Sequence, residues 1–274
     1  MSQPAITVGE LADVLDQLAP AFLAESWDNV GLLLGDRAGP VRCVMTCLTL
    51  TEDVAAEAAG EQVDLVVTHH PLLFKAAKRI TSETPEGRTL LTLMGSRIAV
   101  YSPHTAFDSS HEGINEQLAA ALGLAGTSPL RPATAGEHEP SSPRAGGGRF
   151  GTLDQERSLS EFLALLRERL PAGVIGYTGE LSTTVRRVAV ACGAAAEFLE
   201  DAAARNCHVL VTGEARFHAC LEARARGIAL VLAGHYATER PGVEWLAEQI
   251  GRRFPPLTAW ASRVETDPLQ WSLP

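Results

Sequence analysis

Two segments of the sequence repeat a histidine followed four residues later by a carboxylate, and a histidine pair precedes both. His104 is followed by Asp108, His235 is followed by Glu239, and the pair is His69-His70. Imidazole and carboxylate groups suit Zn, Mn, Fe or Co. The five cysteines contain no CxxC pair, which argues against a thiolate zinc site and against a disulfide framework. These residue types therefore predict a metal site built from histidines and carboxylates.

The number of candidate ligands favours two ions over one. Six groups exceed the need of one tetrahedral ion, and a carboxylate such as Glu239 can bridge two ions held about 3.5–4 Å apart. A lone histidine at a strand end more often caps a strand or packs in the core, so the prediction depends on the whole set. His69-His70 can serve one site only if both residues lie in the turn after a strand, where Pro71 favours a turn.

The elements that must position these residues are short apolar runs alternating with amphipathic segments. This alternation is typical of a mainly parallel α/β sheet, in which ligand sites lie beyond the carboxyl ends of the strands. The candidate ligands follow such runs. Capping boxes at Thr7/Glu10 and Ser158/Glu161 predict the starts of two helices. The predicted strands are Val41–Leu50, Leu65–Thr68, Ile98–Ser102, Val185–Cys192, Val209–Thr212 and Ile228–Leu232.

An internal repeat indicates how the halves are related. With a shift of 144 residues, Val44–His70 aligns without a gap with Val188–Glu214. We therefore expect an α/β fold of two similar halves with mainly parallel sheets and a metal site between them at the strand carboxyl ends. Five Gly, four Pro and three Ser among residues 126–149 predict a linker there. The expected domains are 1–125 and 150–274.

Composition limits the classes of function. The 274 residues are 46% hydrophobic with a net charge of −10, which predicts a globular chain and disfavours electrostatic binding to nucleic acid. A local arginine patch (Arg216, Arg224, Arg226) is the feature that could contradict this average. No signal peptide is visible, and no apolar run approaches the length of a membrane span. We expect a cytoplasmic protein with no membrane partner.

The sequence resembles the Nif-three-like proteins, also called GTP cyclohydrolase 1 type 2 or dinuclear-metal-centre hexameric proteins. Seven ordered blocks covering nearly the whole chain carry this resemblance. They are Glu25-Ser26-Trp27-Asp28-Asn29-Val30-Gly31-Leu32, Thr68-His69-His70-Pro71-Leu72-Leu73-Phe74-Lys75, Tyr101–Asp108, Gly148-Arg149-Phe150-Gly151, Thr212-Gly213-Glu214, Gly234-His235-Tyr236-Ala237-Thr238-Glu239 and Thr266-Asp267-Pro268-Leu269.

The resemblance implies two divalent ions per chain, with Zn, Fe, Mn and Mg as candidates. It implies that His70 and Asp108 hold one ion, that His69 and His235 hold the other, and that Glu239 bridges them. His104 would then transfer protons or support the ligands. The resemblance also implies a toroidal homohexamer, a trimer of dimers. Three positions depart from the family pattern: Thr49 replaces an acidic residue, Ala106 replaces an asparagine, and Cys192-Gly193-Ala194-Ala195 contains less glycine.

Two hypotheses of different classes follow. The first is a metal-dependent hydrolase acting on a small, nucleotide-like molecule, with His104 as the proton-transfer residue and either GTP ring opening or phosphoester cleavage as its chemistry. The alternative is a non-catalytic metal-bound protein, a regulatory or metal-handling hexamer whose ions serve assembly or sensing.

Overall fold

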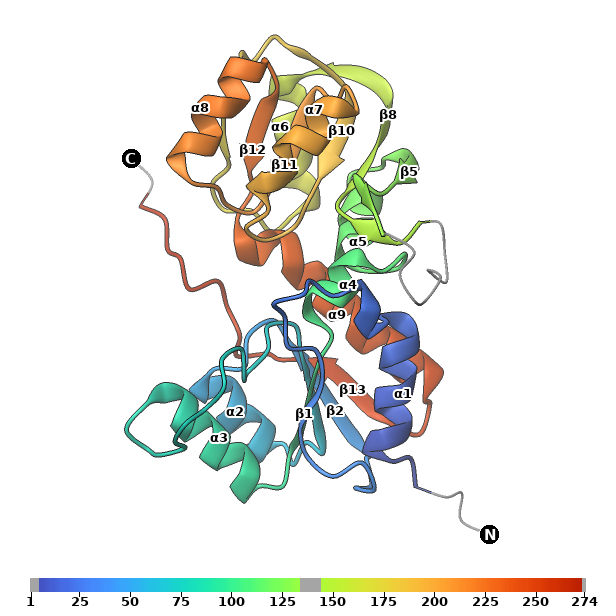
Figure 1. Cartoon of the computed structure of the whole chain (residues 1–274), viewed down its shortest axis with the longest axis vertical. Coiled ribbons are helices and arrows are strands. Elements are labelled where there is room, and N and C mark those ends of the chain that lie inside the picture. The colour runs from blue at the N-terminus through green and yellow to red at the C-terminus, as the bar shows by residue number, and fades with distance from the viewer. Residues whose placement is uncertain (1–4, 134–143, 273–274) are drawn as a thin grey trace. The chain divides into compact units, whose positions relative to one another are not determined.

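The computed structural model describes residues 5–133 and 144–272, and its internal contacts divide the chain into two units (Figure 1). The first unit is Met1–Phe107 with Val243–Thr266, and the second is Asp108–Gly242 with Asp267–Pro274. The boundary falls inside two helices, α4 (His104–Ser109) and α9 (His235–Arg253). Within the described residues, none of the helices is both long and apolar enough to span a membrane.

The first unit contains a five-stranded sheet in the order β1-β4-β3-β2-β13. Three of the four strand pairings in this sheet are parallel, and only β1 runs antiparallel to its neighbour β4. The three strands predicted in this half are confirmed as β2, β3 and β4, with shorter bounds for β2 and β4, whereas β1 and β13 were not predicted. The strands are β1 (Gly31–Leu34), β2 (Cys43–Cys47), β3 (Leu65–Thr68), β4 (Ala99–Ser102) and β13 (Thr258–Ala261).

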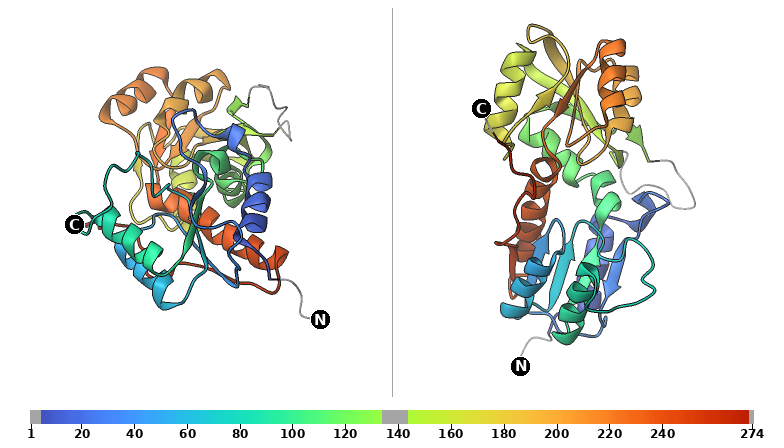
Figure 2. Two further views of the ribbon diagram at one scale, coloured as in Figure 1. Left: turned by 60° about the horizontal axis from the view of Figure 1, so that its bottom comes forward. Right: turned by 90° about the vertical axis from the view of Figure 1, so that its left-hand side faces the viewer.

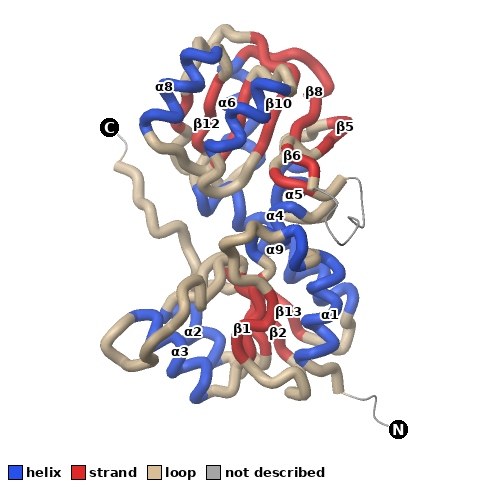
Figure 3. Tube along the Cα trace, viewed as in Figure 1, coloured by secondary structure: helices blue, strands red, loops and turns tan. Residues whose placement is uncertain are grey.

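Helices cover both faces of this sheet. Figure 3 shows α2 (Glu52–Gly60) and α3 (Pro85–Gly95) on one side and α1 (Val8–Leu18) on the other. The capping box predicted at the start of α1 is present, and a single 3-10 turn, Ala21–Leu23, follows this helix. The core beneath α2 and α3 consists of Met45, Cys47, Leu50, Val54, Ala55, Ala58, Val63, Val66, Leu93, Ile98 and Val100.

The second unit contains a six-stranded sheet in the order β5-β8-β10-β11-β12-β9, and a two-stranded ribbon, β6-β7. Only β10, β11 and β12 pair in parallel, while β5, β8 and β9 add antiparallel pairings. The strands are β5 (Ala125–Ser128), β6 (Arg131–Pro132), β7 (Gly146–Gly147), β8 (Arg149–Ser158), β9 (Gly176–Tyr177), β10 (Thr184–Val190), β11 (Val209–Thr212) and β12 (Ala229–Leu232).

Helices also cover both faces of the second sheet. The right-hand view of Figure 2 shows α6 (Leu159–Arg169) and α8 (Phe217–Arg226) on opposite sides of it. The expected capping box at Ser158 begins α6. A 3-10 turn, Ala196–Phe198, leads into α7 (Leu199–Ala204), which packs beside α8, and α5 (Ile114–Ala121) contacts β8. The core under α7 and α8 includes Ala189, Phe198, Leu199, Ala202, Leu210, Ala223 and Leu230.

The repeat seen in the sequence recurs in the pairing of the strands. Val44 pairs with Leu65 across β2 and β3, and Val188 pairs with Val209 across β10 and β11. Both members of the second pair lie 144 residues after their counterparts. Each half thus has a strand, a helix and a parallel strand in the same register, because the apolar positions of the two sequences match.

Two expectations about organisation differ from the structure. The second sheet is mixed instead of mainly parallel, since β5, β8 and β9 were not recognised as strands. The units also differ from the expected domains 1–125 and 150–274, because β13 returns to the first sheet and the expected linker contains β6, β7 and most of β5. Residues 134–143 of the expected linker lie outside the described residues.

A buried arginine explains one of the sequence blocks. The Arg149 side chain is fully buried, and its Nε donates to Glu116 Oε2 at 2.8 Å. Its remaining nitrogens donate to the backbone oxygens of Gly146, Gly148 and Ser110 at 2.6, 2.7 and 2.5 Å. Burial lowers the pKa of Arg149, which the Glu116 carboxylate opposes. The guanidinium therefore fastens α5 to the turn that begins β8.

We expect Arg149→Ala to lower the free energy of unfolding by about 3–5 kcal/mol, because it leaves buried acceptors and a carboxylate without their donor. Arg144 is the matched control, since it also donates to Glu116 but its side chain is 51% exposed. Arg144→Ala should cost less than about 1 kcal/mol. Urea unfolding of both variants measures the difference, and equal losses would contradict this account.

Candidate metal centre

The histidine pair lies in the turn after β3. Both side chains can contribute to one site only from such a turn. His69 and His70 follow Thr68, and their ring centroids are 5.2 Å apart. The Thr68 hydroxyl donates to the backbone oxygen of His70 at 3.0 Å, and the Ser102 hydroxyl donates to that of His69 at 2.8 Å. These bonds hold the turn so that both rings lie on the same side. His69 is buried, at 3% exposure.

His104 completes a three-histidine cluster. Its ring centroid is 5.2 Å from that of His69 and 5.7 Å from that of His70. One nitrogen from each ring can be chosen so that all three lie within 4.8 Å of one another. The His104 backbone has a φ of +28°, in the left-handed region that non-glycine residues rarely adopt. This strain places the imidazole at the first residue of α4, next to the end of β4.

A carboxylate holds the His104 ring. Asp28 Oδ1 lies 2.7 Å from His104 Nδ1, and Thr105 donates to Asp28 Oδ2 through its hydroxyl and, at 3.1 Å, its backbone N–H. Burial raises the pKa of Asp28, but hydrogen bonds from His104 and Thr105 more than offset this and hold it at about 2. Asp28 is therefore ionised and can only accept, so Nδ1 carries the proton. In the neutral ring, Nε2 is then the basic nitrogen.

Thr49, which departs from the family pattern, contacts His70. Its hydroxyl lies 2.7 Å from His70 Nδ1. The backbone N–H groups of Leu48 and Thr49 donate to Glu265 at 2.8 and 2.6 Å. The Glu265 carboxylate thus fixes the turn after β2, and that turn presents the Thr49 hydroxyl to the imidazole. A neutral hydroxyl orients His70 without the negative charge that an acidic residue would add.

The second unit carries its own group of polar side chains at the start of α9. His235 Nδ1 lies 2.9 Å from Glu214 Oε1, and His235 Nε2 lies 3.0 Å from Glu239 Oε2. Hydrogen bonds to Glu239 and Glu214 raise the pKa of His235 to about 9, against the opposite effect of burial. A histidine ligand must be neutral, so an ion at Nε2 would replace a proton.

The turn after β10 packs against this cluster. A Cβ on Gly193 would lie 2.3 Å from Glu239 Oε1 and 3.3 Å from His235 Nε2, and its φ is +64°. The neighbouring Cys192 thiol lies 3.3 Å from Asp108 Oδ1, and burial raises its pKa, so it stays protonated and donates. Only glycine can thus occupy position 193 without displacing the carboxylate, and the thiol orients Asp108.

Each unit thus holds some of the predicted site residues. His69, His70 and His104 lie together in the first unit, and the second unit holds Asp108 beside Cys192 and His235 beside Glu239. The ligand set and the roles assigned to these residues stay predictions. The sequence analysis missed the supporting residues Asp28 and Glu214, although both lie in blocks that carry the resemblance. The sequence spacing gave no signal of the contact between Asp28 and His104, because the two residues are 76 positions apart.

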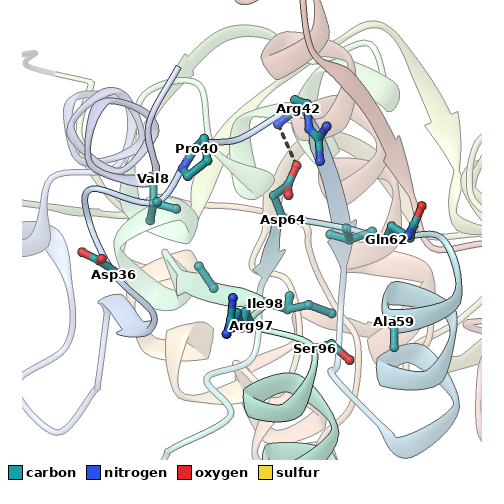
Figure 4. Close-up of a pocket in the computed structure, with 13 residues that line it drawn as sticks. Val8, Asp36, Pro40, Arg42, Ala59, Gln62, Asp64, Ser96, Arg97 and Ile98 are labelled. Carbon is teal, nitrogen blue, oxygen red and sulfur yellow. Dashed lines mark hydrogen bonds between the residues drawn. The ribbon is translucent and has the colours of Figure 1, made fainter. Parts of the chain in front are cut away.

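A pocket of about 620 Å³ lies elsewhere in the first unit, at the amino-terminal ends of its parallel strands (Figure 4). Arg42, Gln62, Asp64 and Arg97 line it, and the Asp64 carboxylate accepts from the Arg42 backbone N–H at 2.7 Å. None of the candidate metal ligands lines this pocket. The pocket therefore lies at the opposite edge of the sheet from the histidine cluster, since the histidines follow the carboxyl ends of the same strands.

Comparisons with known proteins match nearly the whole chain. Residues 6–268 match the family described as Duf34/NIF3 (NGG1p interacting factor 3). A Streptomyces coelicolor protein named GTP cyclohydrolase 1 type 2 homolog is 35% identical over 95% of this chain and 93% of its own length. A Clostridium acetobutylicum protein of the same name is 32% identical over 90% of each chain. A Bacillus cereus protein related to NIF3 shares the fold, with a TM-score of 0.88 at 23% identity, covering 99% of this chain and 100% of its own.

We expect Asp28→Asn to lower the free energy of unfolding of metal-free protein by about 2 kcal/mol at pH 7, which corresponds to a carboxyl pKa held at about 2 instead of 3.8. A carboxyl group whose pKa is lowered by folding stabilises the folded protein at pH values above its ordinary pKa. This stabilisation is lost as the pH falls through the pKa that the group has in the folded protein. The difference between variant and wild type should therefore shrink from pH 4 towards pH 2 in urea unfolding. Asp13→Asn, at a 63% exposed ion pair, is the control and should change stability by at most about 1 kcal/mol at any pH.

Gly193→Ala should weaken metal binding as well as stability, because its Cβ would displace the Glu239 carboxylate. Gly227 is a matched control: its φ is +68° and a Cβ there would meet nothing within 4 Å. Gly227→Ala should cost only the backbone strain of about 1–2 kcal/mol and leave metal content unchanged. Metal analysis and urea unfolding test this pair. Unchanged metal content in Gly193→Ala would show that the turn does not constrain Glu239.

Proposed function

The chain belongs to the Duf34/NIF3 family, and on that premise we propose that it is a metal-dependent hydrolase with two divalent ions and a nucleotide-like substrate. The relatives named GTP cyclohydrolase 1 type 2 homolog support a nucleotide substrate. The observation that carries the proposal is the hydrogen-bonded pair Asp28–His104 beside His69 and His70. Such a pair fixes the tautomer of a proton-transfer residue next to candidate metal ligands.

The donor set fits divalent ions. His69, His70, Asp108, His235 and Glu239 would hold them, with Glu239 as the bridging carboxylate. Three imidazoles favour Zn, Fe or Mn over Mg, which prefers oxygen ligands. The close approach of Gly193 to Glu239 and His235 supports this assignment, since a side chain there would crowd the two candidate ligands. His104 and Asp108 lie one turn apart on α4.

When bound, two divalent ions lower the pKa of water and polarise the bond to be hydrolysed. The residues of the chain would supply orientation and proton transfer. His104 Nε2 would accept a proton and return it to the leaving group, while ionised Asp28 stabilises the charged imidazole. Thr49 and Glu214 would orient His70 and His235 through their Nδ1 atoms, as is usual around ligating histidines.

We also propose a cytoplasmic location and, from the family resemblance alone, a toroidal homohexamer arranged as a trimer of dimers. Sedimentation measures the assembly directly. A non-catalytic metal-bound hexamer is the alternative outcome of the experiment that follows, in which the ions serve assembly instead of hydrolysis.

The test combines metal content with turnover. We expect close to two ions per wild-type chain and a loss of at least one ion in His70→Ala and in Glu239→Ala. His218→Ala and Glu222→Ala on exposed positions of α8 are matched controls and should keep the wild-type content. His104→Gln should keep its metal but lose about 10²–10⁴-fold in turnover of GTP or of a phosphoester panel, as removal of a general acid–base group does.

Three outcomes would contradict the proposal. Fewer than one ion per wild-type chain would remove the metal centre. Two ions without turnover of any tested substrate, together with hexamer loss in Glu239→Ala, would support the non-catalytic alternative. Loss of metal in His104→Gln would make His104 a ligand instead of a proton-transfer residue.

A further inference from the structure

Two exposed aromatic rings adjoin the three-histidine cluster. Trp27 is 57% exposed and Phe74 is 49% exposed. Their centroids lie 5.8 Å apart, and the Trp27 ring lies 6.1 Å from the His104 ring. The rings meet at interplanar angles of 62° and 72°, so none is covered by face-to-face stacking on another. More than half of the indole surface therefore remains accessible beside the candidate proton-transfer residue.

The backbone around these rings is fixed on several sides. The Glu25 N–H donates to Thr105 Oγ1 at 3.0 Å, which ties the tryptophan loop to the start of α4. Asn29 Nδ2 donates to the backbone oxygen of Leu73 at 2.7 Å, which ties the same loop to the segment carrying Phe74. These hydrogen bonds thus hold the two large apolar rings in solvent-exposed positions. Leaving such surface exposed forgoes hydrophobic stabilisation, which is typical of a preformed binding surface.

A basic segment follows directly after Phe74. Lys75 and Lys78 are the only lysines of the chain, and Arg79 comes next. All three residues are exposed, and residues 71–82 contain no acidic side chain. Three positive charges within five residues contrast with the net charge of −10. The segment therefore offers a local site for anionic groups in an acidic protein.

We propose that Trp27 and Phe74 form a stacking platform for the planar heteroaromatic ring of the substrate, and that Lys75, Lys78 and Arg79 receive its phosphate. The ligand class is a nucleotide whose ring lies beside His104. This inference rests on the proposed function, because it assigns the binding residues of the same site. Base–aromatic stacking tolerates different bases, so the platform selects for a flat ring and not for one particular base.

Binding measurements with three probes test the proposal on the full chain. GMP carries both the ring and a phosphate, guanosine carries only the ring, and ribose 5-phosphate carries only the phosphate. We expect Trp27→Ala to weaken GMP and guanosine binding about 5- to 150-fold and to leave ribose 5-phosphate unchanged. Trp27→Phe should keep most of the affinity, because it retains an aromatic face. The double variant Lys75→Ala/Lys78→Ala should weaken GMP and ribose 5-phosphate but not guanosine.

Controls separate stacking from general effects of removing an aromatic residue. Trp271→Ala and Phe217→Ala remove rings that are 52% and 71% exposed in the second unit, and both variants should bind GMP like the wild type. Quenching of tryptophan fluorescence by guanosine should disappear in Trp27→Phe although calorimetry still detects binding. Sedimentation of each variant reports whether assembly has changed.

Several results would overturn the proposal. One is that Trp27→Ala binds GMP with wild-type affinity, and another is that this variant loses ribose 5-phosphate binding as strongly as GMP binding. The proposal also fails if the wild type does not bind GMP, or if Trp27→Ala changes the assembly of the protein without changing its nucleotide binding. The hydrolase proposal fails separately. A wild-type chain that binds GMP through Trp27 but lacks metal-dependent turnover refutes catalysis and keeps the platform. Turnover with unchanged affinity in Trp27→Ala refutes the platform alone.

Discussion

Parallel pairing of strands is the constraint on which the candidate site depends. The carboxyl ends of β2, β3 and β4 meet at one edge of the first sheet, so the turns that follow them bring Thr49, His69-His70 and His104 together. None of these residues is near another in sequence except the histidine pair. The buried apolar strands thus fix the positions of the polar side chains in the turns that follow them. An antiparallel pairing would have sent alternate turns to the opposite edge.

Hydrogen bonds at Nδ1 then decide how each imidazole is used. Thr49, Asp28 and Glu214 contact the Nδ1 atoms of His70, His104 and His235 respectively. The partner of His70 is a neutral hydroxyl, whereas the partners of His104 and His235 are carboxylates. A hydroxyl leaves His70 without an added charge, whereas two carboxylates raise the pKa of His235 to about 9. Similar positions in the fold can therefore supply ligands and a proton-transfer group.

The two units show how one supersecondary unit serves two purposes. The shared register of β2–β3 and β10–β11 keeps the strand ends equivalent, while the residues after those ends differ. The first unit has His69-His70 after β3, and the second has Gly213-Glu214 after β11. Gly213 is required there, because a Cβ would lie 2.6 Å from the Gly193 oxygen and 2.7 Å from the His235 Cα. The first turn carries the candidate ligands His69 and His70, whereas the second allows close contacts of Gly213 with the Gly193 and His235 backbone.

The sequence by itself determined six of the parallel strands, but not β13, together with the capped helices α1 and α6, the 144-residue repeat and the candidate ligands. Periodicity, capping and repeats are local patterns. It did not reveal β5, β8 and β9, whose polar or glycine-rich segments are strands only because a neighbour pairs with them. It also did not reveal Asp28 or Glu214 as partners of His104 and His235, or Trp27 as a neighbour of Phe74. Those contacts join residues far apart in the chain, and only the tertiary structure, by packing the sheets and closing the loops, brings such residues together.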